Sequence, residues 1–578
     1  MKTNSVTYAG RIARWAALLL ALTVGTSFAD TSRISPDLQP LLATNQASNV
    51  KVIVQYNAPP PSNNNNGLLG NVLGSVTQLA GGALNAVFSL IPAVSATLHP
   101  AEILALSNQP NVAYISLDRV LAGSLDYTTG AMNAPAAWTS GLDGSGVGIA
   151  IIDSGIYSHP DLNGHTNQSR VVYRQSFIGG VQFDDFGHGT HVAGIAAGNG
   201  LMSNKPGALH IYKGVAPNAN LLDLRVLDKN GSSNDSVVIA AIDKAVQLKN
   251  QYNIRVINLS LGRPIYEGCA RDPLCQAVEA AWRNGIVVVT AAGNLGRNGY
   301  ATVLCPGNAP HAITVGAMKT EATVNRNDDL IASYSSRGPT YIDLTAKPDV
   351  VAPGNLVVSL FAPGSTLSQE FPENIVHQPE YSTAPATSAV PSYFRLSGTS
   401  MATPAVSGTV ALMLQKDPSL SPDTVKARLM KTASKKFPQS STACDPTTGK
   451  CYTDFYDIFT IGAGYVDIAA VLANYDRANG SAASPQFIYQ PQWQTAILIV
   501  NPLSIWWTSP VWNTNTVWGS TVLQPGPSGS NAAWGSNAVW GTNAAWGTNA
   551  AWGTNAAWGS NAAWGTNAAW GTSGFGEK

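Results

Sequence analysis

Residues 147–155 read Val-Gly-Ile-Ala-Ile-Ile-Asp-Ser-Gly, an apolar run that ends in a carboxylate and a glycine turn. A continuous apolar run of this length is typical of a strand in a parallel sheet that is covered on both faces. Similar runs follow along the chain at 221–226, 256–259, 286–290 and 313–315. Helical patterns separate or follow these runs at 189–198, 236–250, 275–284, 401–416 and 422–433. The alternation predicts a doubly wound α/β fold with a mostly parallel sheet and helices on both faces.

Charge divides the chain. Only 11% of the 578 residues are charged, against about 25% in an ordinary soluble domain. The 99 residues between Arg477 and Glu577 contain no Asp, Glu, Lys or Arg, and 12 of the 15 tryptophans lie among them. We therefore predict that the α/β domain spans 122–477 and that 478–578 is a separate tail.

The tail contains a short repeat. From Asn531 the unit Asn-Ala-Ala/Val-Trp-Gly-Thr/Ser occurs seven times, and Trp512 and Trp518 share its six-residue spacing. An even period places every Trp on one face of an extended chain, so a β-rich repeat is one interpretation. A flexible low-complexity tail is the competing interpretation, and an aromatic binding surface for polysaccharide or a cell surface is a third.

The N-terminal part has the features of a secreted precursor. Residues 1–29 combine a basic start, a short apolar run and a small residue at Ala29, which is typical of a cleaved signal peptide. Residues 30–121 read as a small α+β unit, with strands at 50–56 and 112–120 and an Asn- and Gly-rich insertion between them. The net charge of zero argues against nucleic acid as a partner.

The five cysteines fit an oxidising compartment. Cys444 and Cys451 bracket a turn-rich loop, so we expect them to pair. Cys269, Cys275 and Cys305 leave one odd thiol, and their three possible pairings stay open. No Cys-x-x-Cys or His-rich cluster indicates a zinc site, and we predict no metal ligands.

Four polar residues stand where reactive groups are usually held. Asp153 ends a strand, His188 begins a helix between glycines, Asn294 follows a strand, and Ser400 opens a helix of small residues. Each could simply cap a helix or form a turn. Together they form an acid, a base, a nucleophile and an amide donor in the chain order of the subtilisin triad.

These motifs resemble the subtilisin-like serine peptidases, or subtilases. The segments that carry the resemblance are IIDSGI, HGTHVAG, TAAGN, YSSRGPT, KPDVVAPG and GTSMATP, and they lie within about 122–475. The resemblance implies a secreted serine endopeptidase that acts on polypeptides with Asp153, His188 and Ser400 as its triad. It also implies that Asn294 and the Ser400 N–H bind the oxyanion. No cofactor is required for this chemistry.

The resemblance also implies a path for the substrate. The peptide would lie extended beside residues 227–232 and beside Ser260, Leu261 and Gly262. Ala291, Ala292 and Gly293 would line the primary specificity pocket. Leu304 stands where the family often has Gly, so we expect it to narrow this pocket and to favour small or aliphatic P1 residues. A second departure, Ala405 in place of the family's His, lies outside the triad.

Three further expectations come from the family. Residues 30–121 would be a propeptide that assists folding, inhibits the enzyme and is removed by a cut between about Val120 and Asp126. The family often binds structural calcium, which stays possible, but residues 199–213 contain no Asp or Glu. The rival hypothesis is a surface adhesion or scaffold protein in which the Trp repeat is the main functional part.

Overall fold

The computed structural model describes residues 30–518 except 36–37, 40–41, 43–48, 58–82, 88–92, 118–124, 165, 181–182, 385–389, 445–449, 491–494 and 500. The predicted signal peptide, residues 120–124 of the predicted propeptide cleavage region and the seven regular Trp repeats lie outside the described residues. The chain divides into two compact units, 1–121 and 122–578. Among the described residues, none of the helices has the length and apolar character needed to cross a bilayer.

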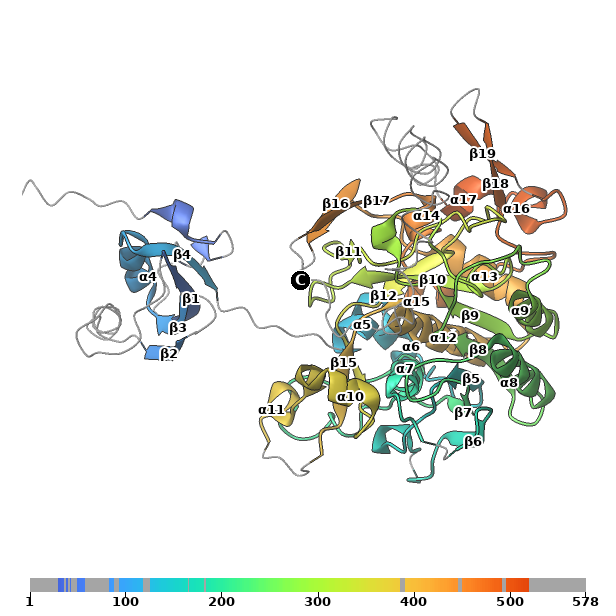
Figure 1. The fold of residues 1–578 in the computed structure, drawn as a ribbon, viewed down its shortest axis with the longest axis horizontal. Coiled ribbons are helices and arrows are strands. Elements are labelled where there is room, and N and C mark those ends of the chain that lie inside the picture. The colour runs from blue at the N-terminus through green and yellow to red at the C-terminus, as the bar shows by residue number, and fades with distance from the viewer. Residues whose placement is uncertain are drawn as a thin grey trace, which may run out of the picture. The chain divides into compact units, whose positions relative to one another are not determined.

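The smaller unit is a four-stranded antiparallel sheet with one longer helix (Figure 1). The strand order is β2 (Ala83–Val87), β3 (Ala93–Leu98), β1 (Val50–Tyr56) and β4 (Val112–Leu117). Helix α4 (Pro100–Ser107) begins with a capping box, in which the His99 N–H donates to Glu102 Oε2 at 2.7 Å. Leu98, Ile103 and Ile115 are among the residues of its small apolar core.

The larger unit is built on a mostly parallel eight-stranded sheet, as the sequence predicts. Along one path the strands are β11 (Leu330–Ile331), β10 (Ile313–Lys319), β9 (Val287–Ala291), β8 (Ile254–Leu259), β5 (Gly148–Asp153), β7 (Asn220–Arg225) and β6 (Val171–Ser176), and β12 (Val350–Pro353) pairs with β10. Only β11 runs antiparallel to its neighbour in this sheet as described. The central strands are buried on both faces, which explains their continuous apolar runs.

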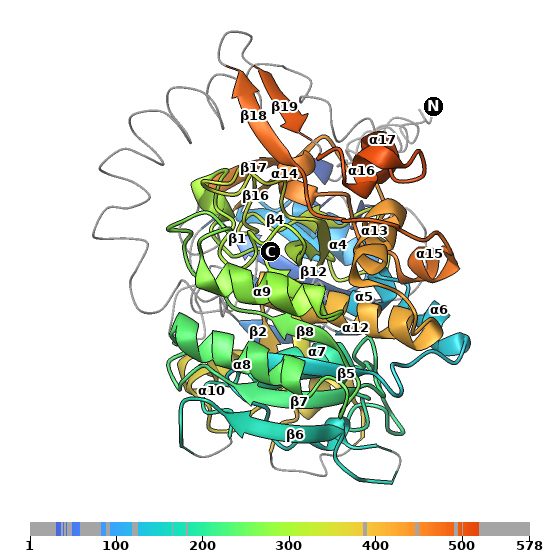
Figure 2. The same cartoon turned by 90° about the vertical axis from the view of Figure 1, so that its right-hand side faces the viewer.

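Alternate residues of the sheet enter two different cores. In β5, Ile149 and Ile151 join the core beneath α7 (His188–Ala197) and α12 (Thr399–Lys416). Ala150 and Ile152 face the opposite core beneath α8 (Asp235–Gln247) and α9 (Pro273–Arg283). Figure 2 shows α8 and α9 lying together across one face of the sheet. Helices therefore cover both faces, as the doubly wound prediction requires.

The segment at 362–396 is rich in Pro, Ser and Thr, a composition typical of a surface loop, but part of it is built into the core. Its β15 (Tyr393–Leu396) pairs with β13 (Val357–Leu360) and with β14 (Ile375–Val376). Two short helices, α10 (Thr366–Glu370) and α11 (Gln378–Tyr381), connect these strands. Tyr393 and Leu396 are almost fully buried. The Pro- and Ser-rich composition of the segment therefore gave no indication of the buried strand β15.

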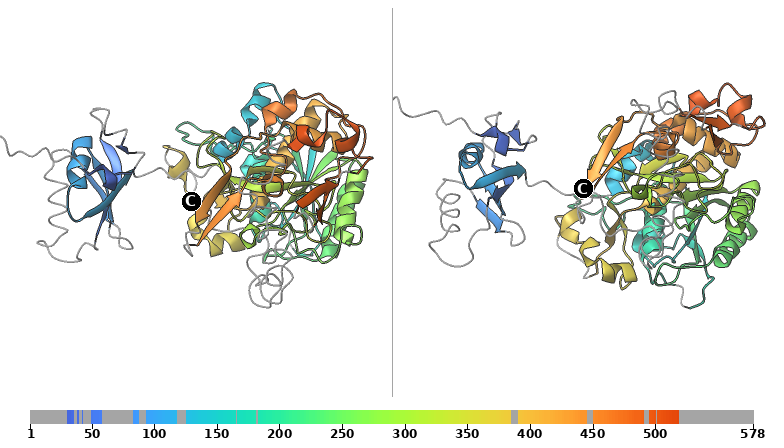
Figure 3. Two further views of the ribbon diagram at one scale, coloured as in Figure 1. Left: turned by 90° about the horizontal axis from the view of Figure 1, so that it is seen from above. Right: turned by 45° about the horizontal axis from the view of Figure 1, so that its top comes forward.

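Four cysteines form two disulfides. Cys444 and Cys451 are paired, as predicted, and join β16 (Ser440–Cys444) to β17 (Cys451–Phe455) in the hairpin that Figure 3 shows from two further sides. Of the three open pairings, the structure has Cys269–Cys275. Cys305 is a buried thiol whose Sγ lies 3.5 Å from Asp272 Oδ2.

The first part of the uncharged tail packs on the larger unit. Helices α16 (Ile505–Thr508) and α17 (Thr514–Trp518) follow the hairpin of β18 (Gln486–Gln490) and β19 (Thr495–Ile499). Trp506, Trp512 and Trp518, six residues apart, are each at most 2% exposed and belong to the main core. The predicted boundary at 477 thus marks a change in composition, while the packed core continues to residue 518.

Candidate functional site

Asp153 is placed by the central strand of the sheet. It is the last residue of β5, and its carbonyl accepts hydrogen bonds from the N–H groups of Val226 and Leu227 in the segment that follows β7. Its carboxylate is buried, and the N–H of Ser154 donates to Oδ1 at 2.7 Å. The strand end and this backbone bond fix the carboxylate in one orientation.

His188 faces this carboxylate from the start of α7. Its Nδ1 lies 2.7 Å from Asp153 Oδ1, and both side chains are buried. Gly187 precedes the helix with φ = 99°, a left-handed conformation that glycine adopts without strain. A Cβ on Gly189 would approach the carbonyl oxygen of Gly155 to 2.2 Å, so a larger residue there would push α7 away from the Asp153 turn.

Ser400 lies in the first turn of α12, where the helix dipole and free N–H groups favour a developing negative charge. Its Oγ donates to the carbonyl of Ser260 at 3.1 Å, and Ser260 Oγ donates to the carbonyl of Ser400 at 2.9 Å. This reciprocal pair attaches the predicted nucleophile to the end of the predicted substrate-binding segment. His188 Nε2 has no hydrogen-bond partner in the described structure.

Asn294 is held by the residue that precedes the serine. Its Oδ1 accepts hydrogen bonds from the N–H of Thr399 at 2.9 Å and from Thr399 Oγ1 at 3.1 Å. With the oxygen occupied in this way, Nδ2 is the part of the amide that can donate to another group. Thr399 Oγ1 also accepts the N–H of Gly293 at 3.1 Å, so a single threonine connects the asparagine turn to α12.

The electrostatics of the site favour a basic imidazole. Burial alone would lower the pKa of His188, but the negative charges of Asp153 and Asp184 outweigh it and raise this pKa above its usual value. His191, three residues along α7, behaves in the opposite way. Burial and the nearby His188 lower the pKa of His191 to about 3, and its Nε2 lies 3.1 Å from two backbone carbonyls. His191 is therefore a neutral structural residue.

Leu304 lies between two of the predicted substrate-binding segments. A Cβ built on Gly262 would approach Leu304 Cβ to 3.0 Å, and one built on Gly293 would approach Leu304 Cγ to 2.7 Å. The N–H of Leu304 also donates to the carbonyl of Ala292 at 2.9 Å. Leu304 thus occupies the space next to both glycines, while Ala291 ends β9 and the buried Ala292 follows it.

Two supporting residues escaped the sequence analysis. Asp184 is fully buried and accepts hydrogen bonds from Ser154 Oγ, the N–H of Gly187, and both the N–H and the Oγ1 of Thr190, at 2.6–2.8 Å. Thr399 is the second supporting residue, because it holds the Asn294 amide and the Gly293 N–H. The signal for Asp184 in the sequence is its position, four residues before His188 and the HGTHVAG motif.

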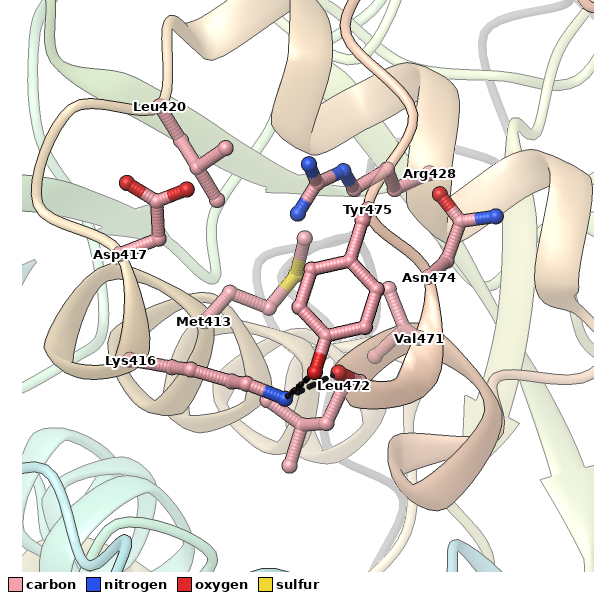
Figure 4. Close-up of a pocket in the computed structure, with 9 residues that line it drawn as sticks. All are labelled: Met413, Lys416, Asp417, Leu420, Arg428, Val471, Leu472, Asn474 and Tyr475. Atoms are coloured by element: carbon pink, nitrogen blue, oxygen red, sulfur yellow. Dashed lines mark hydrogen bonds between the residues drawn. The ribbon is translucent and has the colours of Figure 1, made fainter.

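Two cavities among the described residues are lined by none of the predicted site residues. One, of about 120 Å³, lies between the end of α12, α13 (Pro422–Thr432) and α15 (Ile468–Ala473) (Figure 4). There the Lys416 ammonium donates to the carbonyl of Leu472 at 2.6 Å and to the Tyr475 hydroxyl at 3.2 Å. Within the described residues, no group of three or more His, Cys, Asp and Glu is arranged to hold a metal ion.

Comparison with known proteins places this geometry in a family. The model of the subtilase family, peptidase family S8, matches residues 144–450, which is more than half of the chain. The serine protease AprX of Bacillus subtilis is 38% identical over 363 residues, which cover 61% of this chain and 76% of AprX. Subtilisin E of the same organism is 36% identical over 358 residues, covering 61% and 78%.

Among solved structures, sphericase is 28% identical, covers 61% of this chain and 94% of its own, and has a TM-score of 0.41. The family model and the extent of the matches to AprX and subtilisin E establish the relationship. The chain belongs to the subtilase family and is a subtilisin-like serine endopeptidase.

Proposed function

We propose that the protein is a secreted endopeptidase that hydrolyses peptide bonds with Asp153, His188 and Ser400. The observation that carries the proposal is the buried 2.7 Å contact between His188 and Asp153, with an unpartnered Nε2 on the other side of the ring. Ser400, at the start of α12, supplies the nucleophile. The Ser400 hydroxyl must turn from the Ser260 carbonyl towards Nε2, a rearrangement that substrate binding can bring about.

In the first half of the reaction, Ser400 Oγ attacks the scissile carbonyl carbon while His188 Nε2 takes the hydroxyl proton. The imidazolium is stabilised by the Asp153 carboxylate, which keeps its own negative charge throughout. His188 then passes the proton to the leaving amine, and an acyl-enzyme remains on Ser400. A water molecule then attacks the acyl carbon while His188 Nε2 takes a proton from it. His188 gives this proton to Ser400 Oγ as the bond between Ser400 and the acyl group breaks, and the acid product is released.

The oxyanion of each tetrahedral intermediate would be bound by Asn294 Nδ2 and the N–H of Ser400. The contacts of Asn294 Oδ1 with Thr399 support this role, because they orient the amide before the substrate arrives. We expect Asn294→Leu to lower kcat by about 10²–10³-fold with little change in KM.

The decisive test is casein hydrolysis by the wild type and by Ser400→Ala, with the exposed Ser419→Ala as a matched control. The mechanism predicts that Ser400→Ala loses about 10⁶-fold in kcat, while Ser419→Ala keeps wild-type activity. Full activity in Ser400→Ala would refute the mechanism. An inactive wild type would instead refute the enzymatic function and favour the scaffold alternative.

The precursor organisation is part of the same proposal. Residues 1–29 would direct secretion, and residues 30–121 would act as an inhibitory propeptide that the enzyme removes itself. N-terminal sequencing of the secreted protein should find a new end between about residues 120 and 126. Accumulation of the uncut precursor in Ser400→Ala would support self-processing, and normal cleavage in that variant would contradict it.

For the tail we propose a separate role in attachment to a cell surface or polysaccharide. Support comes from the buried Trp506, Trp512 and Trp518, because they demonstrate that a tryptophan every sixth residue can be fully packed against protein. The chain should be cut after residue 518, since the preceding tryptophans belong to the enzyme core. Retention on insoluble polysaccharide by the full chain but not by the shortened one would support the role, and equal retention would contradict it.

A further inference from the structure

Asp161 connects three separate parts of the larger unit. It lies in a short 3-10 helix (Pro160–Leu162) after β5 and is fully buried. Its backbone carbonyl accepts the N–H of Asn199 at 2.9 Å, and its Oδ1 accepts the N–H of Met202 at 2.8 Å. The turn at 199–203, which follows α7, is thus attached to Asp161 by both the main chain and the side chain.

The second carboxylate oxygen is occupied from the 362–396 segment. The Tyr393 hydroxyl lies 2.7 Å from Asp161 Oδ2 and 3.0 Å from Ser203 Oγ. Tyr393 is fully buried, and its ring packs edge-on against Tyr212 and Tyr381 at centroid distances of 4.7 and 5.2 Å. A buried, packed ring leaves the hydroxyl little freedom to move away from the carboxylate.

The remaining neighbours of Asp161 complete a network of protein groups. Arg170 donates to the carbonyls of Asp161, Ala197 and Ala219 at 2.6–2.9 Å and supplies the nearest full positive charge. Burial lowers the pKa of His159, so this ring is neutral. In this form its Nδ1 accepts the N–H of Asp161 at 3.1 Å, and its Nε2–H donates to the Ser392 carbonyl at 3.0 Å.

This donor set does not suit the calcium ion that the family often binds. Calcium requires six to eight oxygen ligands, with carboxylates that turn their lone pairs towards it. Here the N–H of Met202 and the O–H of Tyr393 point at the two Asp161 oxygens, and an N–H in that position would face the cation with its positive end. The segment 199–213 adds no carboxylate.

We propose that the contact between Tyr393 and Asp161 replaces a metal ion in this chain and fixes the 199–203 turn against the start of the 160–162 helix. The 362–396 segment then has a structural role, because it brings the Tyr393 hydroxyl to the second oxygen of the Asp161 carboxyl group. Two consequences follow: the turn should be insensitive to chelators, and it should depend on one phenolic hydroxyl.

The test uses the full chain carrying Ser400→Ala, which prevents self-digestion and makes the result independent of peptidase activity. Thermal unfolding and hydrogen exchange of peptides covering 199–212 are measured with EDTA and with added calcium. Tyr393→Phe is compared with Tyr381→Phe, which removes a hydroxyl from the same aromatic cluster whose hydrogen-bond partner is Ser392.

The proposal predicts that EDTA and calcium leave both measurements unchanged in the parent chain. Tyr393→Phe should lower Tm by about 3 °C and speed exchange of the Met202 amide by about tenfold or more, because a hydrogen bond is lost and a buried oxygen of Asp161 is left without its partner. Tyr381→Phe should leave that amide unchanged. Faster exchange at 199–212 in EDTA that calcium reverses would overturn the proposal, and so would a Tyr393→Phe variant equal to its parent.

Discussion

Replacing Trp506 by Ala should destabilise the protein strongly, while replacing the adjacent Trp507 should not. Trp506 is 2% exposed, stacks edge-on against Trp518 at 5.2 Å and donates its Nε1–H to the carbonyl of Ala483 at 2.7 Å. Trp507 is 69% exposed. Both variants replace one Trp by Ala at adjacent positions, so they differ only in the burial and the contacts of the Trp that is removed.

The magnitude follows from these contacts. Removing a buried Trp side chain costs about 3–5 kcal/mol, and the unpaired carbonyl of Ala483 adds about 1 kcal/mol. The larger unit has about 376 described residues, so its unfolding entropy is about 0.8 kcal/mol per degree near Tm. Trp506→Ala should therefore lower Tm by about 5–7 °C. Trp507→Ala should cost less than about 0.5 kcal/mol and shift Tm by under about 1 °C.

The measurement is scanning calorimetry of both variants in the Ser400→Ala background, which removes self-digestion during heating. A chain ending at residue 518 should unfold at the temperature of the full chain, and a chain ending at 477 should not fold. Equal Tm values for Trp506→Ala and Trp507→Ala would refute the reasoning. A stable protein that ends at residue 477 would refute it as well.

Three other predictions concern the site and the core. Because the raised pKa of His188 places its protonation above the ordinary value of 6.5, kcat/KM should fall on acidification with an apparent pKa above 6.5, and a lower value would contradict this reasoning. Leu304→Gly should increase kcat/KM for P1 Phe relative to P1 Ala by about tenfold or more in a peptide library; an unchanged ratio would remove Leu304 from the pocket. Asp349→Asn should cost about 3–5 kcal/mol in urea unfolding, because it leaves two buried ammonium groups, those of Lys347 and Lys426, without their carboxylate; a loss under about 1 kcal/mol would contradict that reasoning.

The parallel sheet was predictable because its strands carry their own signal. Burial on both faces requires continuous apolar runs, and the segments at 147–152 and 286–290 have them. The five long helices of the larger unit were also predictable, with boundaries within about three residues; for example, Ser421 and Pro422 mark a helix start in the sequence and the structure has that cap. The shorter helices of this unit, such as α5 (Leu125–Ala131) and α6 (Ala134–Thr139), were not predicted. By contrast, β15 consists of four residues after a Pro- and Ser-rich stretch, and its burial depends on strands far away in the chain.

The candidate site divides in the same way. Asp153, His188, Asn294 and Ser400 could be named because each combines a chemically capable side chain with a strand end or a helix start. Asp184 could not, since an acidic residue between Phe183 and Asp185 looks like part of an ordinary surface loop until its four donors are known. The pairing of Cys269 with Cys275 is a similar case. The sequence allowed three pairings among Cys269, Cys275 and Cys305, and only the fold shows that Cys305 is the cysteine without a disulfide.

The charged residues end at residue 477, but the packed core continues to residue 518. The reason applies to buried segments in general. A segment that packs against an existing domain needs apolar and neutral polar side chains, so the absence of charge is what such a segment and a flexible tail have in common. Ser484 illustrates the difference: its hydroxyl accepts a hydrogen bond from Lys426 at 2.8 Å and donates to Asp349 at 2.5 Å, inside the most buried ion network described. A neutral serine is sufficient at this position because Lys426 and Asp349 of the α/β domain supply the positive and the negative charge. The loss of charge at residue 477 therefore marks only where the chain stops using its own charged side chains. The burial of Trp506, Trp512 and Trp518 shows that the folded enzyme continues to residue 518.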